Sequence, residues 1–121
     1  MSGDSVLDPA VVEQLRALSQ AGSADLLGRL QAAFARDTPV RLGALRAAVA
    51  GGDAAAVAFN AHTLKVSAAN LGAVQVVEIC DQIESLPPLA QAGTVERLLA
   101  ELEDRAAMAQ AELTRLAETG P

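Results

Sequence analysis

The sequence predicts an all-α fold: an antiparallel four-helix bundle with an additional short N-terminal helix. Apolar residues recur at intervals of three and four along five stretches of the 121-residue chain, as on the buried face of a packed helix. Glycine, proline and aspartate separate these stretches, and no useful length alternates with period two, as a strand would. Apolar residues make up 51% of the chain but only two are aromatic, which suits helices packed closely through small side chains. Short connections between long amphipathic helices favour the antiparallel bundle.

The first two predicted helices are marked by a cap and by a proline. Asp8 and Pro9 supply an N-cap acid and a proline at the first helical position, so a short helix is expected from there to about residue 19. Its apolar face carries Val11, Val12, Leu15 and Leu18. The second helix begins near Ser23, and its apolar residues are Leu27, Leu30, Phe34, Leu42, Leu45 and Val49. Pro39 interrupts this pattern, but the spacing resumes in phase, so we expect one kinked helix rather than two.

The last three predicted helices each carry an apolar seam, the line of residues that a packed helix buries. The third is capped by Asp53, ends at Gly72 and steps by three and four through Ala54, Val57, Ala61, Leu64, Ala68 and Leu71. The fourth spans about residues 74–86, before a pair of prolines, with Val76, Ile79, Cys80 and Ile83 inward. The fifth spans about residues 94–117, and its seam is Val95, Leu98, Leu102, Ala106, Ala109, Leu113 and Leu116.

The charge of the chain limits its possible partners, and its cysteine content limits the compartment in which it works. The formal net charge is −6, from 9 basic and 15 acidic residues, and the basic residues are scattered. An acidic chain without a basic stripe suits neither nucleic acid nor anionic lipid, so we expect neither as a partner. Cys80 is the single cysteine, which excludes an intramolecular disulfide and fits a reducing compartment.

The hydropathy pattern indicates a cytoplasmic protein. The first residues lack the basic and apolar regions of a signal peptide, and no uninterrupted apolar run approaches the roughly 18 residues of a membrane span. We expect a monomer with one domain over residues 1–121, in which residues 1–7 are flexible and residues 118–121 are frayed.

His62 is the only histidine of the chain, and it lies on the outer side of the third helix. At roughly 100° per residue, it falls roughly 130° from the centre of the seam, so it is not a core residue. Lys65 is its neighbour one turn along. The outermost side chains beside them are apolar or small: Phe59, Thr63, Val66 and Ala69. This face carries no Asp, Glu or Arg, so we expect no fixed anion to oppose a phosphate there.

Several chemistries are excluded by the residues around His62. One histidine and one cysteine cannot form a tetrahedral zinc site without carboxylates, and no HxxxH or CxxC spacing exists. A hydrolase triad needs a nucleophile and an orienting group at the ring, but Ser67 is five residues away and Cys80 is predicted to face the core. The glycines form no phosphate-binding loop, so no nucleotide site is expected.

The segment around His62 resembles a known family. Residues 61–73, AHTLKVSAANLGA, are similar to the signature of histidine-containing phosphotransfer (HPt) domains, approximately AHxLKGSAxxLGA. The matching positions are Ala61, His62, Leu64, Lys65, Ser67, Ala68, Leu71, Gly72 and Ala73. The stretches LLGRLQAAFARDTPVRLGALRAAVAGGD and VVEICDQIESL resemble the preceding and following family helices, so nearly the whole chain is covered.

The resemblance implies a phosphorelay carrier. His62 would be phosphorylated on Nε2, and Lys65 would be the cation beside the phosphoryl group. The partner-binding residues would be Phe59, Thr63, Val66, Ala69 and Asn70, which we call the partner face. The partners would be receiver domains of response regulators and a hybrid histidine kinase. The chain would need no metal or cofactor of its own and would not be an enzyme, because Mg²⁺ and the catalytic groups would belong to the receiver.

Val66 is the one position that departs from the family signature, which has glycine there. In the family that small residue leaves room for the partner beside the imidazole. Val66 therefore bears on partner affinity or choice of partner more than on the phosphate chemistry.

Two other interpretations stay open. The bundle would be an interaction module if it bound a receiver or kinase through the surface from Phe59 to Val66 without taking phosphate. It would be a plain structural bundle if His62 were an ordinary surface histidine. Both a free-standing carrier and a module of a hybrid kinase fit the sequence.

Overall fold

The computed structural model describes residues 6–20, 26–87 and 92–118, and these form five helices and no strand. The helices are α1 (Pro9–Gln20), α2 (Leu26–Ala50), α3 (Ala54–Asn70), α4 (Val74–Glu84) and α5 (Ala92–Glu118). None of them has an apolar stretch long enough to cross a bilayer. The predicted all-α fold is confirmed.

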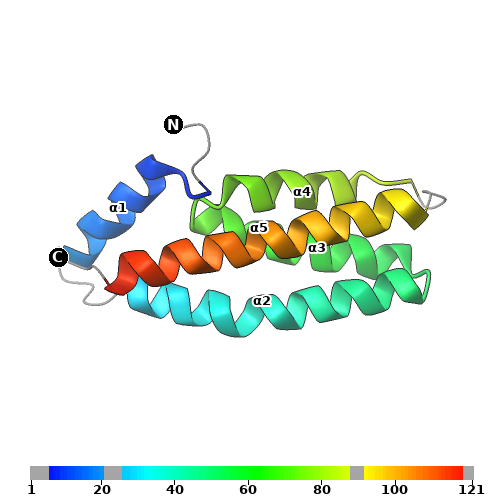
Figure 1. Ribbon diagram of the computed structural model, residues 1–121, viewed down its shortest axis with the longest axis horizontal. Helices are drawn as coiled ribbons and strands as arrows, with labels where there is room; N and C mark the ends of the chain where they lie inside the picture. Colours follow the sequence, from blue (N-terminus) through cyan, green and yellow to red (C-terminus); the bar gives the residue numbers. More distant parts are fainter. Residues whose placement is uncertain (1–5, 21–25, 88–91, 119–121) are drawn as a thin grey trace.

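Helices α2 to α5 form the bundle. They lie side by side and alternate in direction, while α1 lies across one end and packs against α2 (Figure 1). Each bundle helix packs against its neighbour in the chain, and α5 also packs against α2, which closes the bundle. This is the predicted antiparallel four-helix bundle with an additional N-terminal helix.

Helix α2 runs through Pro39 without a break, as the in-phase spacing predicted. Phe34 and Leu45, which lie on either side of the proline, are both buried. The alternative of two separate helices is therefore wrong. The predicted start near Ser23 lies outside the described residues, and the helix begins at Leu26 within them.

The core follows the predicted seams of α3, α4 and α5. The buried seam residues are Ala61, Leu64, Ala68, Leu71, Val76, Ile79, Cys80, Ile83, Leu98, Leu102, Ala106, Ala109 and Leu113. Ala54 differs: it is exposed, because it is the first residue of α3, at the end of the bundle. Leu18 also differs, since it was placed on the packed face of α1 but is 53% exposed.

The ends of α3 and α4 depend on a cap, a glycine and a proline. The Asp53 carboxylate accepts a hydrogen bond from the Ala56 amide at 3.0 Å and caps the start of α3. At the other end Gly72 has φ +72°, and the Ala73 amide donates to the Ala68 carbonyl at 2.9 Å, which is a Schellman stop. Helix α4 ends at Glu84, slightly before the predicted end and still ahead of Pro87.

The segment before α1 is docked on the turn between α3 and α4. Val6 and Leu7 are buried in the core, within the segment that the sequence analysis expected to be flexible; residues 1–5 lie outside the described residues. The Asp8 amide donates to the Gly72 carbonyl at 2.6 Å, and the Asp8 side chain caps α1 through the Ala10 amide. Burial of Val6 and Leu7 favours this docked position, because it removes apolar side chains from water.

The Cys80 thiol is expected to be unreactive in the folded protein. It is fully buried, and burial raises its pKa to about 12, with a smaller contribution from the negative charges of Glu84 and Asp81. Because only the thiolate reacts, we expect iodoacetamide at pH 8 to alkylate Cys80 at least about a hundredfold more slowly in the native protein than in urea. Mass spectrometry measures both alkylation rates. Equal rates in the native protein and in urea would show that the core around Cys80 opens freely.

Candidate functional site

His62 lies in the middle of α3 with its side chain 57% exposed, as the sequence predicted. Its Nδ1 is 3.3 Å from Oε2 of Glu84, the last residue of α4. A carboxylate can only accept a hydrogen bond, so Nδ1 carries the hydrogen in this contact. The lone pair of the neutral ring is then on Nε2, the other ring nitrogen.

Lys65 is held by two carboxylates of α4. Its Nζ lies 2.8 Å from Asp81 Oδ1 and 2.7 Å from Glu84 Oε1. The hydrogen bond that Lys65 donates to Asp81, and then the one that it donates to Glu84, hold the pKa of Lys65 well above its usual range. Lys65 is therefore a permanent cation, as a phosphate-binding role needs, but its ammonium is directed to α4.

The expectation that no acidic side chain lies near His62 is wrong. Helix α3 carries none on this face, but α4 supplies Asp81 and Glu84. These two residues, which we call the α4 carboxylates, are three positions apart and so share one face of α4. The sequence did contain a signal for this: Asp81 and Glu84 each directly follow a residue that was predicted to face inward, Cys80 or Ile83, so both could be expected near the edge of the buried face of α4.

The residues of the partner face lie on α3 as predicted. Phe59 is 65% exposed and Val66 is 49% exposed, which is unusual for large apolar side chains. Ala69 and Asn70 are exposed at the end of the helix. Thr63 is half-buried and donates its hydroxyl to the Phe59 carbonyl at 2.9 Å, so it is the least available of the five.

Asn60 is a buried polar residue that the sequence did not single out. Its side-chain oxygen accepts a hydrogen bond from Arg41 of α2 at 2.9 Å, and its amide nitrogen donates to the Ala56 carbonyl at 2.8 Å. A satisfied buried amide of this kind favours one rotation of α3 against α2. Asn60 therefore helps to keep His62, two residues later, turned towards α4.

Comparison with known proteins identifies the family. A family model described as the Hpt domain matches residues 29–119, which is most of the chain. The chain belongs to the Hpt domain family. Its structure is also similar to the crystal structure of histidine-containing phosphotransfer protein B (HptB) from Pseudomonas aeruginosa PAO1, with a TM-score of 0.78 and 26% sequence identity. That match covers 98% of this chain and 99% of the HptB chain. A search of curated proteins found no match.

Membership of the Hpt family gives the general function. Hpt domains are phosphocarriers of two-component signalling that transfer phosphoryl groups through a histidine and are not enzymes in themselves. His62, its α3 neighbours and the α4 carboxylates all fall inside the matched residues 29–119. Helix α1 precedes that range.

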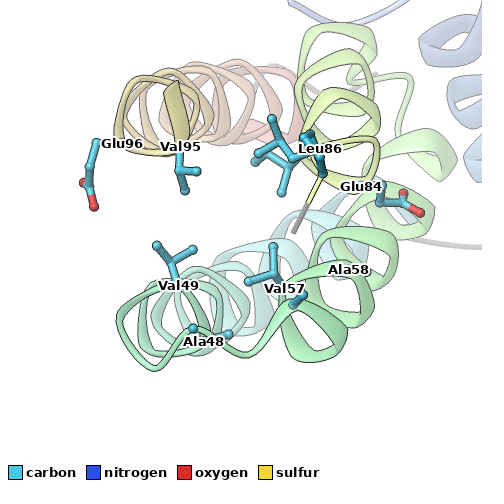
Figure 2. Close-up of a pocket in the computed structure, with 12 residues that line it drawn as sticks. Ala48, Val49, Val57, Ala58, Glu84, Leu86, Val95 and Glu96 are labelled. Carbon is cyan, nitrogen blue, oxygen red and sulfur yellow. The ribbon is translucent and has the colours of Figure 1, made fainter. Parts of the chain in front are cut away.

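The Hpt domain also contains a cavity of about 290 Å³ at one end of the bundle. Figure 2 shows Val49, Val57, Leu86 and Val95 around it, whereas the Glu84 carboxylate points away from it. Its walls are mainly apolar, and His62 does not line it. Within the described residues, no group of three or more His, Cys, Asp or Glu side chains could hold a metal ion. The exposed imidazole is thus the site with the clearest chemistry.

Proposed function

We propose that this Hpt domain carries a phosphoryl group on Nε2 of His62 between receiver-domain aspartates of a multistep phosphorelay. The observation that carries the proposal is the contact between His62 Nδ1 and Glu84 at 3.3 Å on an exposed ring. It supports a tautomer in which the nucleophilic nitrogen is Nε2. The proposed carrier is a cytoplasmic monomer, and residues 1–121 form one domain.

The geometry suggests how the transfer proceeds. The Nε2 lone pair forms the N–P bond while the bond between phosphorus and the receiver's aspartate oxygen breaks, and the carboxylate leaves with that electron pair. Positive charge develops on the imidazole, and the adjacent Glu84 carboxylate stabilises it through Nδ1–H. Lys65 offsets the charge of the phosphoryl oxygens, and the receiver supplies Mg²⁺. Donation to a second receiver is the reverse reaction.

The partner face would dock the receiver or the hybrid histidine kinase. Phe59 and Val66 expose apolar surface beside His62, and such clustered exposure on a domain tends to mark a protein partner. Val40 of α2 is 62% exposed and lines the same small hollow as Thr63, so the docking surface extends to α2. The same apolar surface is what supports the second candidate, an interaction module that takes no phosphate.

Transfer of label separates these two functions. A panel of receiver domains is phosphorylated with radioactive phosphate and incubated with the purified chain. We expect label to move to the chain and to be lost in acid but kept in alkali, as phosphohistidine requires. A receiver that binds the chain without transferring label would instead support the interaction module.

Val66→Gly is expected to change partner choice. A cognate receiver with a hollow that matches Val66 would lose roughly 1–2 kcal/mol of docking free energy, at about 0.8 kcal/mol per buried carbon. A non-cognate receiver that needs close approach to His62 would transfer faster, because the two methyl groups no longer cover the imidazole. Transfer rates from the receiver panel measure both effects.

Val66→Ala is the matched control for this experiment. It removes the same methyl groups, whereas glycine also destabilises α3 by up to about 1 kcal/mol. We expect the alanine variant to show the same change of partner choice at wild-type stability. If both variants change every receiver by the same factor, Val66 has no role in selectivity.

A further inference from the structure

The ammonium of Lys65 is already occupied in the unphosphorylated protein. An ammonium has three donors, and two of them face Asp81 at 2.8 Å and Glu84 at 2.7 Å. Lys65 and Glu84 are each only 23% exposed, so this pair is partly shielded from water. Asp81 is 60% exposed and reaches Lys65 from the solvent side of the pair.

The charged side chains beside the imidazole carry a net negative charge, which disfavours a phosphoryl group there. Lys65 contributes one positive charge, and the α4 carboxylates contribute two negative charges. Phosphorylation of His62 would add up to two more negative charges. A contact between Lys65 and the phosphoryl oxygens must therefore compete with both α4 carboxylates for the ammonium.

The α4 carboxylates differ in what they contact. Glu84 faces both Lys65 and His62 Nδ1, so it also stabilises the positive ring of a phosphohistidine. Asp81 forms an ion pair with Lys65. Within the described residues it forms no hydrogen bond or ion pair with His62. Removal of the Asp81 charge thus takes away one of the two carboxylates that hold Lys65 and leaves the contact of Glu84 with the ring in place.

We propose that Asp81 is a positioning residue that holds Lys65 on α4 and thereby shifts the transfer equilibrium from phosphohistidine towards the phosphorylated receiver. The inference rests on the proposed transfer through His62. In the reaction concerned, the N–P bond of phosphohistidine breaks, an aspartate oxygen of the receiver forms the new P–O bond, and the imidazole recovers its lone pair on Nε2. Asp81 raises the free energy of the phosphohistidine side of this exchange, so the domain passes phosphate on rather than storing it.

The test measures the equilibrium constant of this exchange for wild type and Asp81→Asn. The receiver is one that exchanges label with the wild-type chain, and phosphoramidate serves as a second, partner-free phosphate donor. We expect Asp81→Asn to shift the equilibrium towards phosphohistidine by about two- to fivefold, the range of an exposed ion pair. Asp81→Glu keeps the charge and is expected to restore most of the wild-type value.

Two further variants show whether the effect passes through Lys65. In a Lys65→Ala background, Asp81→Asn should change the equilibrium little, because the residue that it positions is gone. Glu78→Gln removes an exposed charge from the same helix, at a position without an ion pair among the described residues, and is expected to have a smaller effect.

Each outcome has a definite meaning. A wild-type chain that takes no phosphate from receivers or phosphoramidate would overturn both the proposed function and this inference. A wild-type chain that exchanges phosphate, with an unchanged equilibrium in Asp81→Asn, would overturn the role of Asp81 alone. Equal shifts in Asp81→Asn and Glu78→Gln, or an undiminished shift without Lys65, would assign the effect to net charge and overturn the positioning role.

Discussion

His62→Gln is expected to abolish acid-labile phosphorylation while the bundle remains folded. The glutamine amide can still reach Glu84, but its nitrogen has no free lone pair with which to attack phosphorus. His62 is 57% exposed, and substitutions at such surface positions change the free energy of unfolding by less than about 0.5 kcal/mol. The measurements are label transfer from a phosphorylated receiver and the thermal midpoint, which should stay within about 3 °C of wild type.

The outcome is unambiguous because the chain has no other histidine. Acid-labile label that persists on the glutamine variant would contradict the assignment of His62. A large fall in the thermal midpoint would contradict the exposed position of the ring and point to a structural role.

Gly72→Ala is expected to give the largest loss of stability among the substitutions discussed. Gly72 has φ +72°, where a residue with a Cβ loses roughly 1–2 kcal/mol. A Cβ at this position would also lie 2.8 Å from the Cβ of Val11 and 3.1 Å from that of Asp8. The docked N-terminal segment would have to move, which adds about 1–3 kcal/mol. Urea denaturation measures the total loss.

Gly52→Ala is the matched control for this prediction. Gly52 also has a positive φ, of +67°, but no atom lies within 4 Å of a Cβ built there. The Gly52→Ala variant therefore measures the free-energy cost of backbone strain alone, without the cost of steric crowding. Equal losses for the two variants would show that the docked segment accommodates the added methyl group at position 72 without further cost, and would contradict the predicted crowding.

The features that the sequence predicted depend on local chemistry. Apolar spacing along one helix places His62 outside and Ala61, Leu64 and Ala68 inside, whatever the helix packs against. Caps and breakers such as Asp53 and Gly72 act within a few residues, so the predicted ends of α3 were close to those observed. The general phosphotransfer function followed from a continuous motif, residues 61–73, in the second half of this helix and the turn after it.

The features that the sequence did not predict depend on how one helix is rotated against another. Asp81 and Glu84 reach Lys65 because packing turns their face of α4 towards α3, and no periodicity within α3 contains that information. Val6 and Leu7 were missed because a short apolar pair ahead of a helix has no period. The Asn60–Arg41 hydrogen bond likewise joins two helices whose relative rotation only the structure defines.

The pairing of His62 with α4 has a consequence for how the site forms and persists. Glu84 is 22 residues from His62, and Asp81 is 16 residues from Lys65, so these contacts lie within the α3–α4 hairpin. Helices α2 and α5 are joined by a pair with a much longer sequence separation. Arg46 of α2 donates two hydrogen bonds, of 2.5 and 2.7 Å, to Glu103 of α5, which is 57 residues away. Contacts of short sequence separation lose less chain entropy and form earlier in folding. We therefore expect the environment of the imidazole to be assembled before the bundle closes, and to survive fluctuations that transiently separate α5 from α2.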